Sequence, residues 1–231
     1  MSRRPFVIAA TAVVALLVPA IAGAHGVGRG DASYLQTLEG AAIGPLMYLG
    51  AKHMVTGYDH LLFLVGVIFF LHRLRDIVLY VSLFTIGHST TLLAGVLGGI
   101  HGNPFLVDAI IGLSVVYKAF DNLRGFQRIW GWQPDTRIAV LAFGLCHGFG
   151  LATRLQEFAL PPRGLVANIV SFNAGVEIGQ IVALAGVLIG LTCWRTRGGF
   201  LQYAFATNVA LMTAGFVLMG YHVCGYLIAT A

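Results

Sequence analysis

Residues 53–64 read His-Met-Val-Thr-Gly-Tyr-Asp-His-Leu-Leu-Phe-Leu, which places two histidines and a carboxylate at the start of an apolar segment. Residues 61–71 carry no charge, so Asp59 and His60 enter a region where ionisable groups are costly unless they are paired. Across the 231 residues, 58% are hydrophobic and only 10% are charged, against about 25% charged in soluble domains. The sequence therefore predicts an all-α polytopic membrane protein.

Six apolar segments approach the ~20 residues that cross a bilayer. They are residues 54–71, 77–100, 104–120, 138–152, 165–194 and 200–228. The gaps after the first, third and fifth segments hold two, three and two arginines, whereas the second gap holds none and the fourth holds two. The positive-inside rule then predicts that the three arginine-rich gaps face the cytoplasm of a bacterial inner membrane. The net charge of +5 is accordingly a topology signal, and nucleic-acid binding is not expected.

The N-terminus has the three-part pattern of a secretory signal peptide over residues 1–24, with Ala22-Gly23-Ala24 as the cleavage motif. The alternative is a retained first transmembrane helix. Residues 25–52 are expected to form a periplasmic tail and an interfacial or short re-entrant helix. Residues 53–231 then form a six-helix transmembrane domain with its mature N-terminus in the periplasm.

Polar side chains on several predicted spans fall at similar depths, which favours one shared cluster. We predict that its metal ligands are His53, Asp59, His60, His88, His147 and Glu177. We expect supporting or pathway roles for Ser89, Asn173, Gln180 and Asp108. Imidazole and carboxylate ligands suit divalent nickel or cobalt, with zinc as a further candidate, and the absence of a cysteine cluster argues against copper(I).

Spacing limits how these residues cooperate. On a regular helix the Cα atoms of His53 and His60 would lie ~10.5 Å apart, too far for one ion held by ~2 Å bonds. Either Gly57 breaks the helix, or the two histidines serve successive stations. Asp59 points ~100° away from His60 on a helix, so we expect it to fix the tautomer of a histidine on another span. Glu177 shares one helix face with Asn173 and Gln180.

Four motifs in order give the chain a recognisable resemblance. They are His53 with Asp59-His60, then Phe-Thr-Ile-Gly-His-Ser-Thr-Thr-Leu at 84–92, Phe-Gly-Leu-Cys-His-Gly-Phe-Gly at 143–150, and Phe-Asn-Ala-Gly-Val-Glu-Ile-Gly-Gln at 172–180. Together they resemble the HupE/UreJ family of membrane proteins. The resemblance implies a nickel or cobalt permease associated with hydrogenase or urease, with a homo-oligomer or metalloenzyme maturation proteins as candidate partners besides the metal ion and membrane lipid. The family's better-characterised branch has a second histidine and a glutamate around the third motif, where this chain has only His147 and Gly150.

Three function classes follow from the residues. A permease would bind a divalent cation from the periplasmic side and release it to the cytoplasm. An intramembrane hydrolase would hold zinc with His60, His88 and His147 and use Glu177 to activate the bound water. An assembly or scaffold subunit would not need the buried charges. We expect the permease, because the ligand set suits cation binding, although polar residues toward the cytoplasm are sparse.

Overall fold

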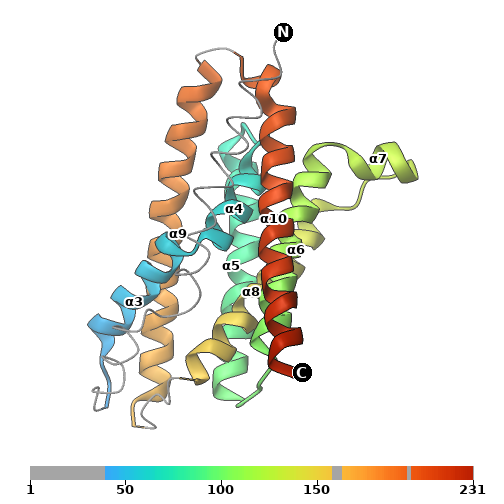
Figure 1. The fold of residues 1–231 in the computed structure, drawn as a ribbon. Helices are drawn as coiled ribbons and strands as arrows, with labels where there is room; N and C mark the ends of the chain where they lie inside the picture. Colours follow the sequence, from blue (N-terminus) through green and yellow to red (C-terminus); the bar gives the residue numbers. More distant parts are fainter. Residues whose placement is uncertain (1–39, 158–162, 197–198, 231) are drawn as a thin grey trace.

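The computed structural model describes residues 40–157, 163–196 and 199–230, and within them it confirms an all-helical fold (Figure 1). The helices are α3 (Ile43–Thr56), α4 (Tyr58–Ile68), α5 (Leu74–Leu97), α6 (Pro104–Asn122), α7 (Gly125–Trp130), α8 (Thr136–Gln156), α9 (Leu165–Thr196) and α10 (Phe200–Thr230). The predicted signal peptide, residues 1–24, and the following residues 25–39 lie outside the described part of the chain.

Four helices are long and apolar enough to cross a membrane: α5, α8, α9 and α10. The sequence predicts six such spans, and four of the described helices meet the length and hydropathy that a span needs. The 19-residue α6 carries three charged side chains, Asp108, Lys118 and Asp121, which lower its hydropathy. The helix α4 is also apolar but only 11 residues long.

The predicted first span, residues 54–71, is not one continuous helix. It begins in the last turn of α3, breaks at Gly57 and continues as α4. Gly57 has an extended backbone (φ −72°, ψ 104°), and a Cβ built on it would lie 2.9 Å from the His53 carbonyl oxygen and 3.0 Å from His60 Nδ1. Of the two alternatives that the histidine spacing left open, the broken helix is therefore the one that the chain adopts.

The helix expected before residue 53, interfacial or short re-entrant, corresponds to α3. The helix α3 begins at Ile43 and packs along α9, burying Leu46, Leu49, Gly50 and Met54. The Asn168 side chain on α9 joins the two elements, because its Oδ1 accepts a hydrogen bond from the Ala42 backbone at 2.8 Å. The helix therefore belongs to the bundle.

Three helix pairs, α3 with α9, α5 with α8, and α6 with α10, make the most extensive contacts in the described residues. Each pair meets at glycines. A Cβ on Gly175 would collide with the α3 backbone, one on Gly148 with the α5 backbone, and one on Gly112 with the α10 backbone. Small residues let helix axes approach closely in membranes, where water contributes no hydrophobic driving force. The shorter α4 lies among these pairs (Figure 1).

Local signals set two helix starts. The Asn103 side chain accepts hydrogen bonds from the first backbone N–H groups of α6, and Pro104 occupies the first turn, where no N–H is needed. Asp135 caps α8 in the same way through the Arg137 backbone. These caps fix the heights at which α6 and α8 present their polar residues.

Candidate metal centre

The helix break gathers histidines from four helices around His60. The ring centroid of His60 lies 5.1 Å from that of His53 on α3, 6.0 Å from His88 on α5 and 5.0 Å from His147 on α8. A continuous helix would hold His53 and His60 two turns apart. The break at Gly57 is thus what makes four imidazoles neighbours, and we call His53, His60, His88 and His147 the histidine cluster.

Asp59 belongs to this cluster through its own chain neighbour. Its Oδ1 lies 2.9 Å from His60 Nδ1 and also accepts a 2.9 Å hydrogen bond from the His60 backbone N–H. The expectation that Asp59 orients a histidine on another span was therefore wrong. Because α4 starts at this point, its first N–H groups have no helical partner, and the carboxylate turns toward them.

Two rings have assigned tautomers. A carboxylate accepts hydrogen bonds, so His60 Nδ1 carries the proton toward Asp59 and its Nε2 keeps a lone pair. His147 Nδ1 donates in the same way to the Phe143 carbonyl oxygen, 2.8 Å away. This pattern, with one ring nitrogen anchored and the other free, is the one that metal-ligating histidines show in proteins.

The free nitrogens of the cluster lie buried without a hydrogen-bond partner among the described residues. They are His53 Nε2, His60 Nε2, both ring nitrogens of His88, and His147 Nε2. His60, His88 and His147 are at most 3% exposed, and each unsatisfied polar atom at such a depth costs about 1–3 kcal/mol. A divalent cation would satisfy several of them at once, because neutral imidazole is a good ligand for nickel, cobalt and zinc.

The rings are near one another but are not arranged around a single point. In the described part of the chain, no three His, Cys, Asp or Glu side chains already stand at metal-binding geometry. Binding one ion would require the rings to turn until their free nitrogens converge at ~2 Å from it. Such turns need side-chain rotation within the cluster and no new helix.

Glu177, predicted as a ligand, faces elsewhere. Its side chain is exposed in a groove between α5 and α9, where its Oε1 accepts a 3.2 Å hydrogen bond from Asn173 Nδ2. The groove is lined by Val78, Val81, Ser82, Thr85, Ile86, Glu177, Gln180, Ile181 and Leu184. Gln180 divides this groove from the cavity beside His60, since it lines both, and its Oε1 accepts from Thr85 Oγ1 at 2.9 Å.

The remaining predicted residues divide into two groups. Ser89 Oγ and Asn173 Oδ1 are buried without a hydrogen-bond partner in the described residues, as the histidine nitrogens are. Asp108 instead pairs with Arg154 Nη2 at 2.6 Å and lies 3.7 Å from His222 Nδ1. It therefore takes part in an ion-pair cluster that joins α6, α8 and α10.

Sequence reasoning missed a layer of phenylalanines against the histidine cluster. The Phe63 ring lies 5.4 Å from Phe84 and 5.9 Å from Phe143, and it also lies 5.3 Å from His147. We call Phe63, Phe84 and Phe143 the aromatic layer. The available signal is spacing, because each of the three stands three or four residues from a cluster histidine, on the side toward the α7 end of the bundle.

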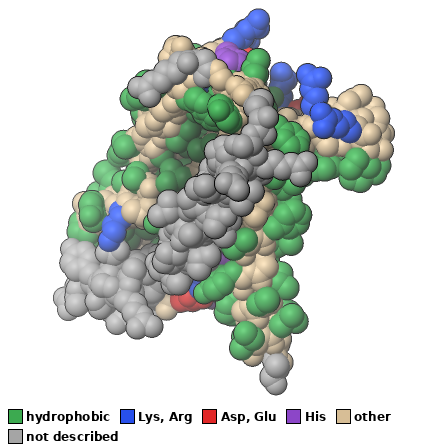
Figure 2. All heavy atoms as spheres, turned by 45° about the horizontal axis from the view of Figure 1, so that its top comes forward, with side chains coloured by type: hydrophobic (Ala, Val, Ile, Leu, Met, Phe, Trp, Pro, Cys, Tyr) green, Lys and Arg blue, Asp and Glu red, His purple; other side chains and the backbone are tan. Residues whose placement is uncertain are grey.

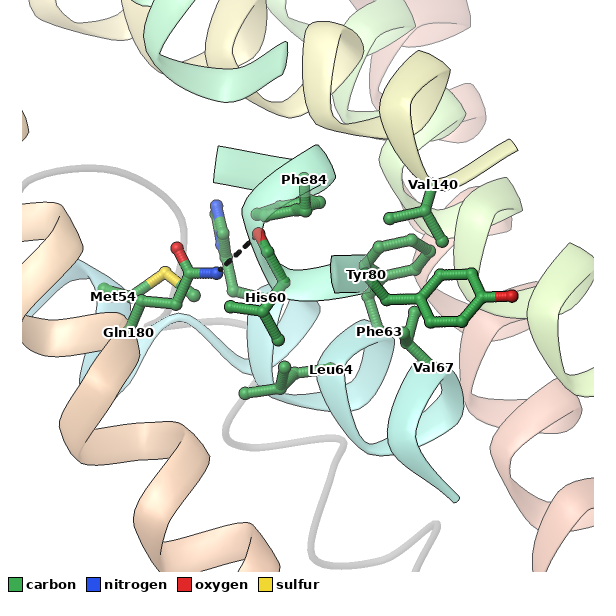
Figure 3. Close-up of a pocket in the computed structure, with 10 residues that line it drawn as sticks. Met54, His60, Phe63, Leu64, Val67, Tyr80, Phe84, Val140 and Gln180 are labelled. Carbon is green, nitrogen blue, oxygen red and sulfur yellow. Dashed lines mark hydrogen bonds between the residues drawn. The ribbon is translucent and has the colours of Figure 1, made fainter. Parts of the chain in front are cut away.

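A cavity beside His60 extends past this layer (Figure 3). It is lined by Met54, His60, Phe63, Leu64, Val67, Tyr80, Val81, Phe84, Val140 and Gln180. Its volume of about 10 Å³ is near the minimum that holds one water molecule. The space beside His60 on the side toward the α7 end is thus small and mostly apolar.

Comparison with known proteins gives one match. The sequence model of a protein family described as HupE / UreJ protein covers residues 29–230, nearly the whole chain and all four histidines of the histidine cluster. No curated protein and no solved structure matches the chain.

Proposed function

We propose that this chain, which belongs to the HupE/UreJ family, is a membrane permease for divalent nickel or cobalt and binds the ion at the histidine cluster. Membership of the family suggests a role in metal uptake or as an accessory to it. The single observation that carries the proposal is the set of five buried, unpartnered ring nitrogens on four histidines, of which His60, His88 and His147 are buried and His53 is half-buried. In a purely structural polar network these nitrogens would be hydrogen-bonded to one another or to neighbouring groups, whereas in a cation site they stay free to bind the ion.

The helix break supports transport in particular. Discontinuous helices mark the ion sites of many secondary transporters, because their exposed ends and a small hinge movement serve binding and release. Here the break at Gly57 lies between His53 and His60. A turn of α4 about this residue would change the distance between the two rings while α3 stays packed on α9.

Charge balance favours Asp59 as the compensating carboxylate. It lies against His60, whose free nitrogen is the central ligand candidate. A carboxylate bonded to a ligating histidine raises the basicity of the ring and offsets part of the cation's charge. Glu177 faces the α5–α9 groove instead, which also removes the base that an intramembrane zinc hydrolase would need beside its metal-bound water.

The aromatic layer supplies the barrier that a permease needs on one side of its site. Packed apolar side chains exclude water and block a hydrated cation, as hydrophobic constrictions do in channels. We propose that the α7 end faces the cytoplasm, as the arginine distribution predicts. In this arrangement α6 and the α3–α4 pair complete the passes across an inner membrane. The aromatic layer opens after the ion has bound from the periplasmic side.

Uptake by proteoliposomes tests the proposal. Vesicles with an enclosed nickel-sensitive dye should accumulate nickel or cobalt when they contain the wild-type protein, and should lose that uptake with His60→Ala. The matched control is His72→Ala, an exposed histidine in the loop between α4 and α5 that should leave uptake unchanged. Equal uptake by wild type and His60→Ala would reject the histidine cluster as the transport site.

A further inference from the structure

The short helix α7 and its flanking loop form an arm that leaves the bundle sideways, between the end of α6 and the start of α8 (Figure 1). Its apolar side chains are unusually exposed: Ile129 is 64%, Trp130 58% and Trp132 57% exposed. Exposed tryptophans are enriched where a protein meets the interface of a bilayer. The arm therefore presents a surface that bundle packing does not explain.

The arm also carries positive charge. Arg124 and Arg128 are exposed on it, and Arg137 follows at the start of α8, whereas Asp135 is the single exposed carboxylate between them. Figure 2 shows the arm standing out from the bundle with basic and hydrophobic side chains on different sides. This division is typical of a segment that lies in the plane of a membrane surface.

The arm is firmly held at its root. The Phe126 ring lies 5.0 Å from Tyr117 and 4.9 Å from Phe120, both on α6. Asp121 accepts hydrogen bonds from Gln133 and Thr136, which tie the far side of the loop back to α6, and Lys118 neutralises its charge at 2.5 Å. Trp130 and Trp132 lie 5.7 Å and 6.3 Å from the Phe126 ring, and Trp130 also lies 6.0 Å from Phe120, yet more than half of each tryptophan stays exposed.

Arg124 has a left-handed backbone conformation and faces a cleft beside the arm. It is the non-glycine residue with a positive φ, 56°, in the described part of the chain, a conformation that costs a non-glycine residue roughly 1–2 kcal/mol. It lines an open cleft of about 690 Å³ between the arm and the bundle. The other lining residues are Phe70, Asp121, Asn122, Gln127 and Gln133.

We propose that this arm binds the anionic phospholipid surface of the leaflet on the α7 side, with its tryptophans and Ile129 among the acyl chains and Arg124 and Arg128 at the phosphates. The charge and the direction of the arm favour this lipid partner. The arm is cationic and amphipathic, and it extends sideways from the end of the bundle that carries most of the arginines. The inference depends on membrane insertion alone and is independent of the ion that the histidine cluster binds.

Tryptophan fluorescence in vesicles tests the proposal, because Trp130, Trp132 and Trp194 are the three tryptophans of the chain. The full-length Trp194→Phe protein would be reconstituted with acyl-brominated phosphatidylglycerol or with equally brominated phosphatidylcholine. Both lipids should quench the arm tryptophans, and the anionic lipid should quench them more strongly. Replacing Arg124 and Arg128 by glutamine should reduce this preference by about fivefold per arginine, equivalent to about 1 kcal/mol each.

The control replaces Arg73 and Arg75, which are exposed at the same end but at the start of α5, by glutamine and should keep the preference. Quenching by aqueous acrylamide without quenching by lipid would show the arm standing free in water and overturn the proposal. Shielding from both would show that a protein surface or a second copy covers the arm, and would overturn it equally. Equal quenching by both lipids would refute the proposed preference of the arm for anionic headgroups.

Discussion

Replacing Asp59 by asparagine should weaken binding of nickel or cobalt by about 10- to 100-fold, or ~1.4–2.7 kcal/mol, the usual effect of losing a carboxylate that orients a ligating histidine. The structure gives the reason. Asp59 Oδ1 receives two hydrogen bonds of 2.9 Å, both from His60, and its side chain is 25% exposed. The asparagine oxygen can still accept them, but it lacks the charge that makes such bonds roughly twice as strong.

The matched control is Glu177→Gln, which removes the same charge from a carboxylate that faces the α5–α9 groove. It should change affinity by less than about twofold, as expected for sites that share no partner. Isothermal titration of purified protein with nickel would compare the two variants, and the visible spectrum of the cobalt form would report changes in ligand geometry. If Glu177→Gln lost more affinity than Asp59→Asn, the assignment of Asp59 as the compensating charge would be refuted.

Three further perturbations test other parts of the account. Gly57→Ala should lower metal affinity at least ~10-fold, because its Cβ would press on His60 Nδ1 and Asp59 Oδ1; a titration that matches wild type would contradict the role of the break. Phe63→Ala should release metal to a chelator on the α7 side ~10-fold faster, because it opens the aromatic layer. Phe200→Ala removes an equally apolar ring that stacks on Phe69 and should not change the release rate; equal release rates for the two variants would refute the barrier. Gly148→Ala should destabilise the bundle by about 1–3 kcal/mol in thermal unfolding because its Cβ meets the α5 backbone, while Gly190→Ala, with open space around it, should be neutral or stabilising; the opposite order would contradict the packing.

Several features of the fold and site follow from the sequence. The apolar segments predict membrane helices, and the conflict between the His53–His60 spacing and metal-bond lengths already offers a break at Gly57 as one solution. Similar depth predicts that His60, His88 and His147 come together, and the structure places the His88 ring 6.0 Å and the His147 ring 5.0 Å from that of His60.

The parts that could not be predicted depend on direction around a helix axis. Counting residues along a span gives the depth of a side chain in the membrane but not the direction in which it points around the helix axis. Asn173 and Gln180 are buried while Glu177, between them on the same stripe, is exposed, so the stripe straddles the edge of the buried face of α9. The partner of Asp59 depends on where α4 begins, because only a helix start leaves N–H groups free for a carboxylate. The aromatic layer needs the tertiary structure, because the three- or four-residue spacing of its phenylalanines from the cluster histidines does not tell which side chains face one another.

X-ray absorption spectroscopy of the nickel-loaded protein tests the central claim most directly. The account predicts at least three imidazole nitrogens around the ion at ~2.0–2.1 Å, the length of a metal–histidine bond, and the loss of this signal with His60→Ala. A shell of water oxygens alone, or an imidazole signal that survives His60→Ala and disappears with substitution of the exposed His72, would contradict it.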